Sequence, residues 1–414
     1  MKFSASVVLL GIVGLLQLAS GEVGAQTPAP GPAPSPGGGP LGHAATSLCA
    51  ELIEPNGYEC HEYNATTGDG FILGIQNMPA RCTCAPGKNS PVLLQHGLTA
   101  GGDNWVNNSP QESLAFILVE ACFDVWIANS RAIQWSHGHE YLTPADEAYW
   151  AWTYDELASY DLKASTELVY NVRGKKTSYV GHSLGTTILF AGLTQGKFNT
   201  TVRGYLNSAV MLAPIAYASS RSNQSAAPVL SATIAQYSTN ATYLAGAMEY
   251  DSYATLHAIC GLPLINPAPC LFALTQFLGP STYTNESRLG FYTQYLSQPT
   301  STYNLEHLGQ GFISGNFSFF DKGTHDNYET YGQPTAPNYD VTKFPADLPM
   351  QYWTGGIDAI ADPEDAAHLL SLLPNSIREV YTLSNYGHTD FILGYNAYKD
   401  VYPKLIQFLA AHVN

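Results

Sequence analysis

The sequence predicts an α/β fold with a mostly parallel central sheet, helices on both faces and an inserted cap. Short, continuously apolar runs have the length and composition of buried strands. These runs alternate with segments of helical apolar spacing, the order that joins parallel strands by crossover helices. The alternation stops between about 215 and 344, where Tyr, Ser, Thr and Gly dominate. We therefore expect this stretch to be a cap inserted into the sheet domain.

The elements follow in chain order. A hairpin is expected at its start, with strands at 57–64 and 71–77 joined by the turn signal Thr67-Gly68-Asp69-Gly70. A helix start is expected at Asp362, followed by Pro363 and two acidic residues at the positive end of the helix dipole. Further strands are predicted at 91–95, 123–128, 177–180, 205–214, 348–353 and 377–383, and helices at 112–122, 160–172, 186–190, 229–236, 271–278 and 401–413.

The first residues indicate an exported chain. Residues 1–25 combine Lys2, an apolar run and small residues, as in a secretory signal peptide, and residues 26–45 form a Pro/Gly-rich linker. We expect the sheet domain at 46–214 and 345–414, with the cap or lid at 215–344. No apolar run has the length of a membrane-spanning helix, so none is expected.

The charge balance excludes some partners. The chain has 17 Lys and Arg against 33 Asp and Glu, a net charge of −16. This balance argues against binding nucleic acid and against electrostatic docking to anionic lipid. Any contact with a membrane or a lipid droplet would have to be apolar.

The seven cysteines suggest disulfides in an exported chain, with one cysteine left over. Cys260 and Cys270 would close a small Pro-rich loop, and Cys122, in an apolar stretch, is the expected free thiol. A zinc site is a weaker alternative, because Cys82-Thr-Cys84 lacks ligand spacing and no His pair follows. Another bridge is expected among Cys49, Cys60, Cys82 and Cys84.

Seven sequons offer acceptors for N-glycans, which we expect on the surface. They are Asn64, Asn107, Asn199, Asn223, Asn240, Asn285 and Asn316.

The motif Gly181-His182-Ser183-Leu184-Gly185 stands between a short buried strand and a helix. This context is typical of a nucleophile elbow, in which a sharp turn exposes the serine hydroxyl above the sheet edge. The two glycines let the backbones pass closely. Ser183 is therefore the candidate nucleophile. The alternative is a glycine-rich turn with a solvated serine, which the flanking strand and helix disfavour.

A nucleophilic serine needs a base, and the base needs an acid that holds its tautomer. Asp358 and His388 follow Ser183 in the order expected for a doubly wound hydrolase, each after a strand at the carboxyl edge of the sheet. An ordinary loop histidine is the alternative for His388. The other acids fit less well, because Asp362 and Asp365 are expected to begin a helix and Asp390 lies beside the base. The other histidines also fit less well. His182 should point to the other side of the elbow, His368 falls within a predicted helix, and His412 is near the C-terminus.

Acyl transfer also needs hydrogen-bond donors for the developing oxyanion. The backbone N–H of Leu184, directly after the nucleophile, is one candidate. The other is the N–H of Leu98, in the segment His96-Gly97-Leu98 after an earlier strand. Only backbone groups are required, so apolar side chains are acceptable at both positions.

From about Gly57 to the C-terminus, the chain resembles the acid lipase family, which includes gastric and lysosomal lipases and their plant relatives. Several motifs, in order, carry the resemblance. They are Gly57-Tyr58, Asp69-Gly70-Phe71-Ile72-Leu73, Gln95-His96-Gly97-Leu98, Asn129-Ser130-Arg131, Trp135-Ser136, His139, WTYDELASYD at 152–161, the elbow, Tyr339-Asp340, GGIDAIADP at 355–363 and Gly387-His388-Thr389-Asp390-Phe391.

The resemblance implies an α/β-hydrolase core with a cap and lid, the triad Ser183, Asp358 and His388, and an oxyanion hole at Leu98 and Leu184. No metal or organic cofactor is implied. Position 184 is Leu where many members have Gln. Ala132 stands where Gly is usual, and the Pro-rich linker is outside the family pattern.

These features together predict a secreted serine lipase that acts on neutral lipid esters such as triacylglycerols or steryl esters, at a lipid–water interface. An extracellular, apoplastic, vacuolar or lysosome-like location is expected. Two alternatives stay open: an esterase for smaller or polar esters, and a catalytically silent protein of the same fold that binds lipid.

Overall fold

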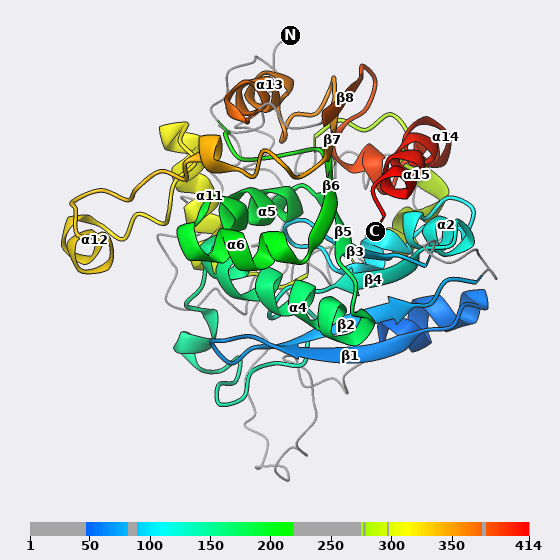
Figure 1. Ribbon diagram of the computed structural model, residues 1–414, viewed down its shortest axis with the longest axis horizontal. Coiled ribbons are helices and arrows are strands. Elements are labelled where there is room, and N and C mark those ends of the chain that lie inside the picture. Colours follow the sequence, from blue (N-terminus) through cyan, green and yellow to red (C-terminus); the bar gives the residue numbers. More distant parts are fainter. Residues whose placement is uncertain are drawn as a thin grey trace, which may run out of the picture. The chain divides into compact units, whose positions relative to one another are not determined.

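An eight-stranded sheet runs through the part of the chain that the structure describes (Figure 1). The computed structural model describes residues 47–81, 89–218, 275, 279–295, 298–374 and 378–413. The sheet has the order β1-β2-β4-β3-β5-β6-β7-β8. The strands are β1 (His61–Thr66), β2 (Ile72–Met78), β3 (Pro91–Gln95), β4 (Asp124–Ala128), β5 (Thr177–His182), β6 (Leu206–Leu212), β7 (Met350–Gly355) and β8 (Arg378–Leu383).

The strand directions agree with the predicted α/β class. Strands β3 to β8 run parallel to one another, and β2 runs antiparallel to both β1 and β4. The expected hairpin is confirmed, although its first strand begins at His61. Gly57 precedes it in a left-handed turn at φ +80°, which an extended strand does not accommodate.

Helices cover both faces of the sheet. Alternate residues of a strand point to opposite faces: Leu93 packs in one core with α4, α5 and α13, whereas Leu94 packs in a second core with α2 and α15. Figure 1 shows α4, α5 and α6 on one side of the strands and α2, α14 and α15 on the other. The helices are α2 (Leu114–Glu120), α3 (Tyr154–Glu156), α4 (Leu162–Arg173), α5 (Leu184–Thr194), α6 (Gly196–Gly204), α10 (Leu289–Tyr292), α11 (Thr302–Ser314), α12 (Thr324–Tyr331), α13 (Pro363–Leu372), α14 (Ala397–Asp400) and α15 (Tyr402–Ala411).

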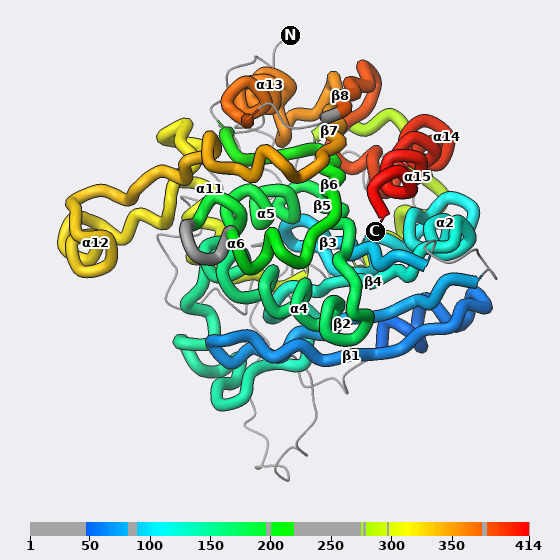
Figure 2. The backbone as a smooth tube through the Cα atoms, in the orientation of Figure 1, coloured from blue at the N-terminus to red at the C-terminus, as the bar shows by residue number. Residues whose placement is uncertain are grey.

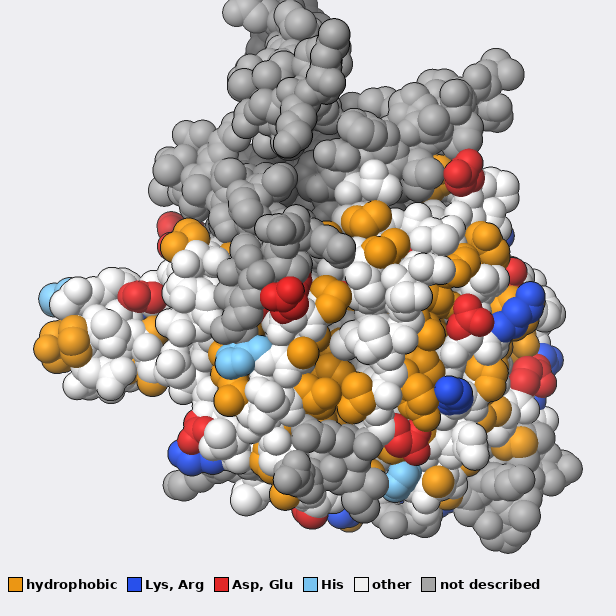
Figure 3. All heavy atoms as spheres, turned by 90° about the horizontal axis from the view of Figure 1, so that it is seen from above, with side chains coloured by type: hydrophobic (Ala, Val, Ile, Leu, Met, Phe, Trp, Pro, Cys, Tyr) orange, Lys and Arg blue, Asp and Glu red, His pale blue; other side chains and the backbone are white. Residues whose placement is uncertain are grey.

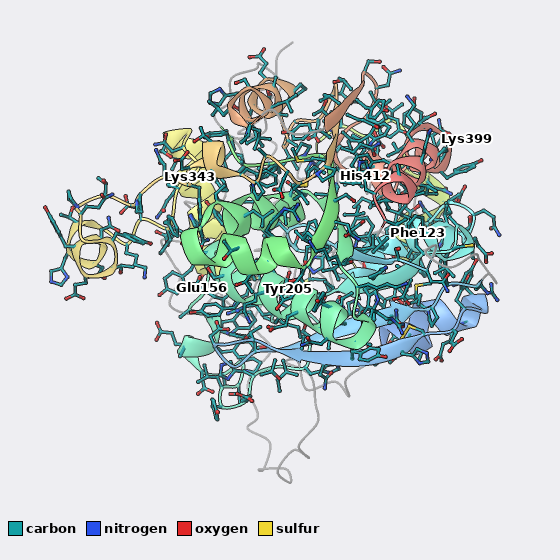
Figure 4. All side chains as sticks on the ribbon, in the orientation of Figure 1. Phe123, Glu156, Tyr205, Lys343, Lys399 and His412 are labelled. Carbon is teal, nitrogen blue, oxygen red and sulfur yellow. A yellow bond between two sulfur atoms is a disulfide. The ribbon has the colours of Figure 1, made fainter. Side chains whose placement is uncertain are left out.

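The two cores explain why the apolar runs are continuous. Strands β3, β4, β5 and β7 are buried at every residue, as expected for a parallel sheet that is covered on both faces. Figure 4 marks Phe123, which belongs to the core shared by α2 and α15, and Tyr205, which packs against Tyr170 of α4 on the other side.

The chain between β6 and β7 is the predicted insertion. Its described residues include α10, α11 and α12, and Figure 2 traces α11 and α12 in yellow before the chain returns to β7 in orange. The expected helix at 229–236 lies outside the described residues, as does nearly all of the one at 271–278. The described part contacts the sheet domain. For example, Gln298 N donates to Thr99 O at 2.9 Å, and Ser301 Oγ donates to Trp150 O at 2.5 Å.

One cysteine prediction is wrong. Cys122 is disulfide-bonded rather than free. Helix α2 ends at Glu120, so Cys122 lies beyond its apolar face in a turn at φ +68°. Cys49 pairs with Cys60, which removes both thiolates from the zinc alternative. The proposed bridge between Cys260 and Cys270 lies outside the described residues, as do residues 1–25 and 26–45.

The sequons do not all lie on the surface. Asn64 and Asn316 are exposed, as expected. Asn107 is fully buried, and its Nδ2 donates to Asp103 Oδ2 at 3.2 Å. The expectation of a surface position is therefore wrong for Asn107. Among the described residues, no helix combines the length and apolarity that crossing a bilayer requires.

Candidate active site

Ser183 occupies a sharp turn between β5 and α5. Its backbone has φ +55° and ψ −124°, a conformation that L-residues rarely adopt and that is typical of strained functional positions. Gly185 makes the turn possible: a Cβ there would lie 2.5 Å from Gln95 O at the end of β3. The strand-turn-helix context predicted for Ser183 is present.

Ser183, His388 and Asp358 form one hydrogen-bonded chain. His388 Nε2 lies 2.7 Å from Ser183 Oγ, and His388 Nδ1 lies 3.0 Å from Asp358 Oδ2. The carboxylate can only accept, so Nδ1 carries the proton and Nε2 accepts from the serine hydroxyl. This is the tautomer that a general base requires.

The acid is held by its own turn. Asp358 Oδ1 accepts from Ile360 N at 2.9 Å and from Ala361 N at 2.8 Å. These bonds hold the carboxylate in place, with Oδ1 and Oδ2 at 3.1 and 3.0 Å from His388 Nδ1. The exposed fractions are 6 % for Ser183, 4 % for His388 and 0 % for Asp358, so the chain lies in an environment of low dielectric constant, where its electrostatic interactions are strong.

The competing acids have other partners. Asp362 Oδ1 accepts from Glu364 N at 2.9 Å and caps α13, as predicted. Asp390 binds the insertion: its carboxylate accepts from Thr282 N at 3.1 Å, from Tyr283 N at 3.0 Å and from the hydroxyl of Ser281. The same carboxylate accepts from Gly387 N at 2.8 Å. Asp390 therefore ties the insertion to the loop that carries His388.

His182, which was expected to point to the other side of the elbow from the nucleophile, contacts the residue proposed as the base. His182 Nε2 donates to the carbonyl of His388 at 2.9 Å, and the two rings lie 5.0 Å apart. Burial, together with the nearby His388, lowers the pKa of His182 to about 3. The ring is therefore a neutral donor. Its position next to Ser183 in the motif indicated that His182 lies near the site, but sequence position does not reveal the direction of a side chain.

The two expected oxyanion positions lie on either side of Ser183. Leu184 is the first residue of α5. Leu98 lies in the turn after β3, next to Gly97, where a Cβ would come within 2.9 Å of Ser183 Cβ. The absence of a side chain at Gly97 lets this loop approach the nucleophile. Both backbone N–H groups thus belong to segments that adjoin Ser183.

A buried arginine, Arg131, forms ion pairs with Asp161 and Asp69, to which sequence reasoning assigned no role. Arg131 Nη2 lies 2.6 Å from Asp161 Oδ1, and Nη1 lies 2.7 Å from Asp69 Oδ2. Asp161 Oδ2 also accepts from the backbone N of Arg131 at 3.0 Å.

Ala132, next in the chain, has φ +66°. Glycine adopts this conformation without strain, which explains why the family pattern has glycine there.

One group of side chains has the proximity of a metal site. His325, Asp326 and Glu329 have ligand atoms within 4.8 Å of one another, all on exposed α12. Acidic groups on an exposed helix commonly lie this close without an ion, and no other observation indicates a metal, so we assign none.

The fold is that of the α/β-hydrolases, and the chain Ser183–His388–Asp358 has the hydrogen-bonded geometry that serine hydrolases of this class require. Residues 49–109 match the model of the partial α/β-hydrolase lipase region. A solved structure, the epoxide hydrolase CorEH, shares the fold at 16% identity, with a TM-score of 0.51 over 85% of this chain and 99% of that one.

Two relatives identify the family. Triacylglycerol lipase 1 from Arabidopsis thaliana is 36% identical over 90% of this chain and 92% of its own length. Human gastric triacylglycerol lipase is 34% identical over 88% of this chain and 91% of its own length. The chain belongs to the acid lipase family of α/β-hydrolases, which includes plant triacylglycerol lipases and gastric lipases.

Proposed function

We propose that the protein is a secreted serine lipase that hydrolyses carboxylic ester bonds of neutral lipids through an acyl-enzyme on Ser183. One observation carries the proposal: the 2.7 Å contact from Ser183 Oγ to His388 Nε2, continued by the 3.0 Å contact from Nδ1 to Asp358. The names of the relatives, triacylglycerol lipases of plant and animal origin, support an ester of glycerol as substrate.

In the acylation step, His388 Nε2 takes the hydroxyl proton as Ser183 Oγ attacks the ester carbonyl. The Asp358 carboxylate holds Nδ1–H and stabilises the imidazolium that forms. The C–O bond to the alcohol then breaks, and His388 returns the proton to the leaving oxygen. In the second step, His388 takes a proton from water as the water oxygen attacks the acyl carbon. The bond from that carbon to Ser183 Oγ then breaks, His388 returns the proton to Oγ, and the fatty acid leaves.

The negative charge that develops on the carbonyl oxygen needs donors. We assign this role to the backbone N–H groups of Leu98 and Leu184, which adjoin Ser183 from two sides. Removal of one such donor typically lowers turnover by about 10²- to 10³-fold. Neither donor depends on a side chain, so Leu at position 184 is compatible with the role.

The substrate class follows from charge and family. The chain carries a net charge of −16, which disfavours anionic headgroups. On the face drawn in Figure 3, hydrophobic side chains are frequent and Lys and Arg are few. We therefore propose triacylglycerols as substrates, with steryl esters as a second group, at a lipid–water interface. Residues 215–344 would form the cap that binds the acyl chains.

We also propose entry into the secretory pathway through a signal peptide at 1–25, followed by a linker at 26–45. The destination would be the extracellular space, the apoplast, or a vacuole or lysosome-like compartment. N-terminal sequencing of the protein recovered from a culture medium should begin near Gln26. A retained Met1 in exported protein would contradict this.

A fluorophosphonate probe tests the chemistry. It phosphonylates only activated serines, so we expect labelling at Ser183 in the wild-type protein and none in Ser183→Ala. The variant should unfold at the wild-type temperature and lack ester hydrolysis. An unlabelled wild-type protein would favour the silent lipid-binding alternative.

A substrate panel tests the class of ester. We expect higher turnover on emulsified triolein than on a short soluble ester of equal concentration, and a rate that rises when the substrate forms an interface. A preference for short or polar esters without an interfacial gain would favour the esterase alternative.

A further inference from the structure

His96 connects the end of β3 to the loop that carries Leu98, and both of its ring nitrogens are hydrogen-bonded inside the protein. His96 Nδ1 lies 2.8 Å from Gly97 O. Ser130 N donates to His96 Nε2 at 3.0 Å. The carbonyl can only accept and the amide can only donate. The partners therefore select one neutral tautomer, with the proton on Nδ1.

The bond to Gly97 O acts on the peptide unit that matters for catalysis. The C=O of Gly97 and the N–H of Leu98 belong to the same planar peptide group. Among the described residues, no peptide bond is cis, so this N–H points opposite to the C=O. A bond that holds the carbonyl oxygen on the His96 side therefore aims the Leu98 N–H to the other side.

The opposite end of the imidazole is anchored to a rigid segment. Ser130 Oγ accepts from Gln95 Nε2 at 3.1 Å, and Ser130 O accepts from Ser136 Oγ at 2.8 Å. The next residue, Arg131, is bound by Asp161 through both its backbone and its guanidinium. The direction of the Ser130 N–H is thus set by these hydrogen bonds, none of which involves the triad.

We propose that His96 is a positioning residue that orients the Gly97–Leu98 peptide so that the Leu98 N–H faces the oxyanion. The inference rests on the proposed function, because it assigns the donor to Leu98. It adds a residue whose side chain contacts neither substrate nor triad and acts only through the backbone. The neutral state that this requires agrees with burial, which lowers the pKa of His96 to about 4.

Three substitutions separate positioning from packing. His96→Asn places an amide N–H near the position of Nδ1 and can keep the bond to Gly97 O. His96→Gln reaches the position of Nε2 and can keep only the bond from Ser130 N. His96→Phe keeps a ring of similar size and loses both bonds. Far-UV circular dichroism and thermal unfolding show whether each variant folds.

The proposal predicts that His96→Phe and His96→Gln lower kcat by about 10- to 100-fold, less than outright removal of a donor, with KM within about threefold of wild type. His96→Asn should retain most of kcat. A trifluoromethyl ketone, which forms a hemiketal oxyanion on serine, should lose affinity by the same factor as kcat/KM.

A merely structural role would give a different pattern. The inference would be overturned if the loss of kcat in all three variants followed their loss of unfolding temperature, or if His96→Phe kept the wild-type kcat. In either case, ester hydrolysis by the wild-type protein would leave the proposed function intact. If the wild-type protein hydrolyses no ester and Ser183 is not labelled by a fluorophosphonate, the proposed function fails and this inference fails with it.

Discussion

The Nε2–H of His182 donates to the backbone carbonyl of His388 at 2.9 Å. His182, the residue before Ser183, therefore holds the loop that carries His388. His182 is the last residue of β5, and His388 lies in the loop after β8, so this bond joins the two segments that carry Ser183 and His388. Its contribution can be tested without touching the triad.

His182→Phe should lower kcat by about three- to tenfold, because a hydrogen bond of this kind is worth about 0.5–1.5 kcal/mol. His182→Gln can keep a donor near the Nε2 position and should lose less. Steady-state kinetics on a soluble ester measure both. A wild-type kcat in a folded His182→Phe variant would show that the bond does not position the base.

The carboxylate of Asp390 accepts from three backbone amides and from the Ser281 hydroxyl. Asp390→Asn should lower the free energy of unfolding by roughly 2–4 kcal/mol, because the new amide would face N–H donors and leave them unpaired. Ser281→Ala is the matched control and should cost about 1 kcal/mol or less, since the backbone donors remain. Urea unfolding measures both; equal losses would argue against this role of Asp390.

Arg131 makes the buried ion pair with Asp161 and Asp69. Arg131→Met should lower the unfolding free energy by about 3–5 kcal/mol, because it leaves buried carboxylates without a counter-charge. Arg203→Met removes an ion pair in which Asp347 is 76% exposed, and should cost at most about 1 kcal/mol. Similar losses in the two variants would contradict the distinction between the buried and the surface pair.

Asp103 should make stability depend on pH. Burial raises its pKa from 3.8 to about 6. A raised pKa in the folded state contributes stability that is complete below about pH 4 and lost as the pH rises through 6. Asp103→Asn removes this pH-dependent loss of stability, because the amide does not ionise. Its amide can be accommodated by rotation of Asn107, whose Oδ1 has no hydrogen-bond partner among the described residues.

The difference in unfolding free energy between Asp103→Asn and wild type should therefore rise from pH 4 to pH 7 by up to about 3 kcal/mol in favour of the variant. Urea titrations at several pH values provide the measurement. A flat difference between wild type and Asp103→Asn would mean that Asp103 does not titrate in this range.

Much of the molecule could be predicted from local patterns. Strand β3 has the predicted bounds, 91–95. Asp362 caps α13, as its residue type and the following proline indicate. The turn at Ser183 follows from contiguous residues around it. The order of nucleophile, acid and base along the chain, each after a strand, was enough to select Asp358 and His388. These signals are local because dihedral preferences and apolar spacing act over a few residues.

Other features depend on contacts that no local pattern encodes. Cys122 was predicted to be free, because an apolar stretch does not reveal that the helix ends two residues earlier. His182 binds a carbonyl 206 positions away, and His96 binds an amide 34 positions away. Partners of this kind are brought together by the packing of the sheet and its loops, and the directions of buried donors and acceptors are decided only there.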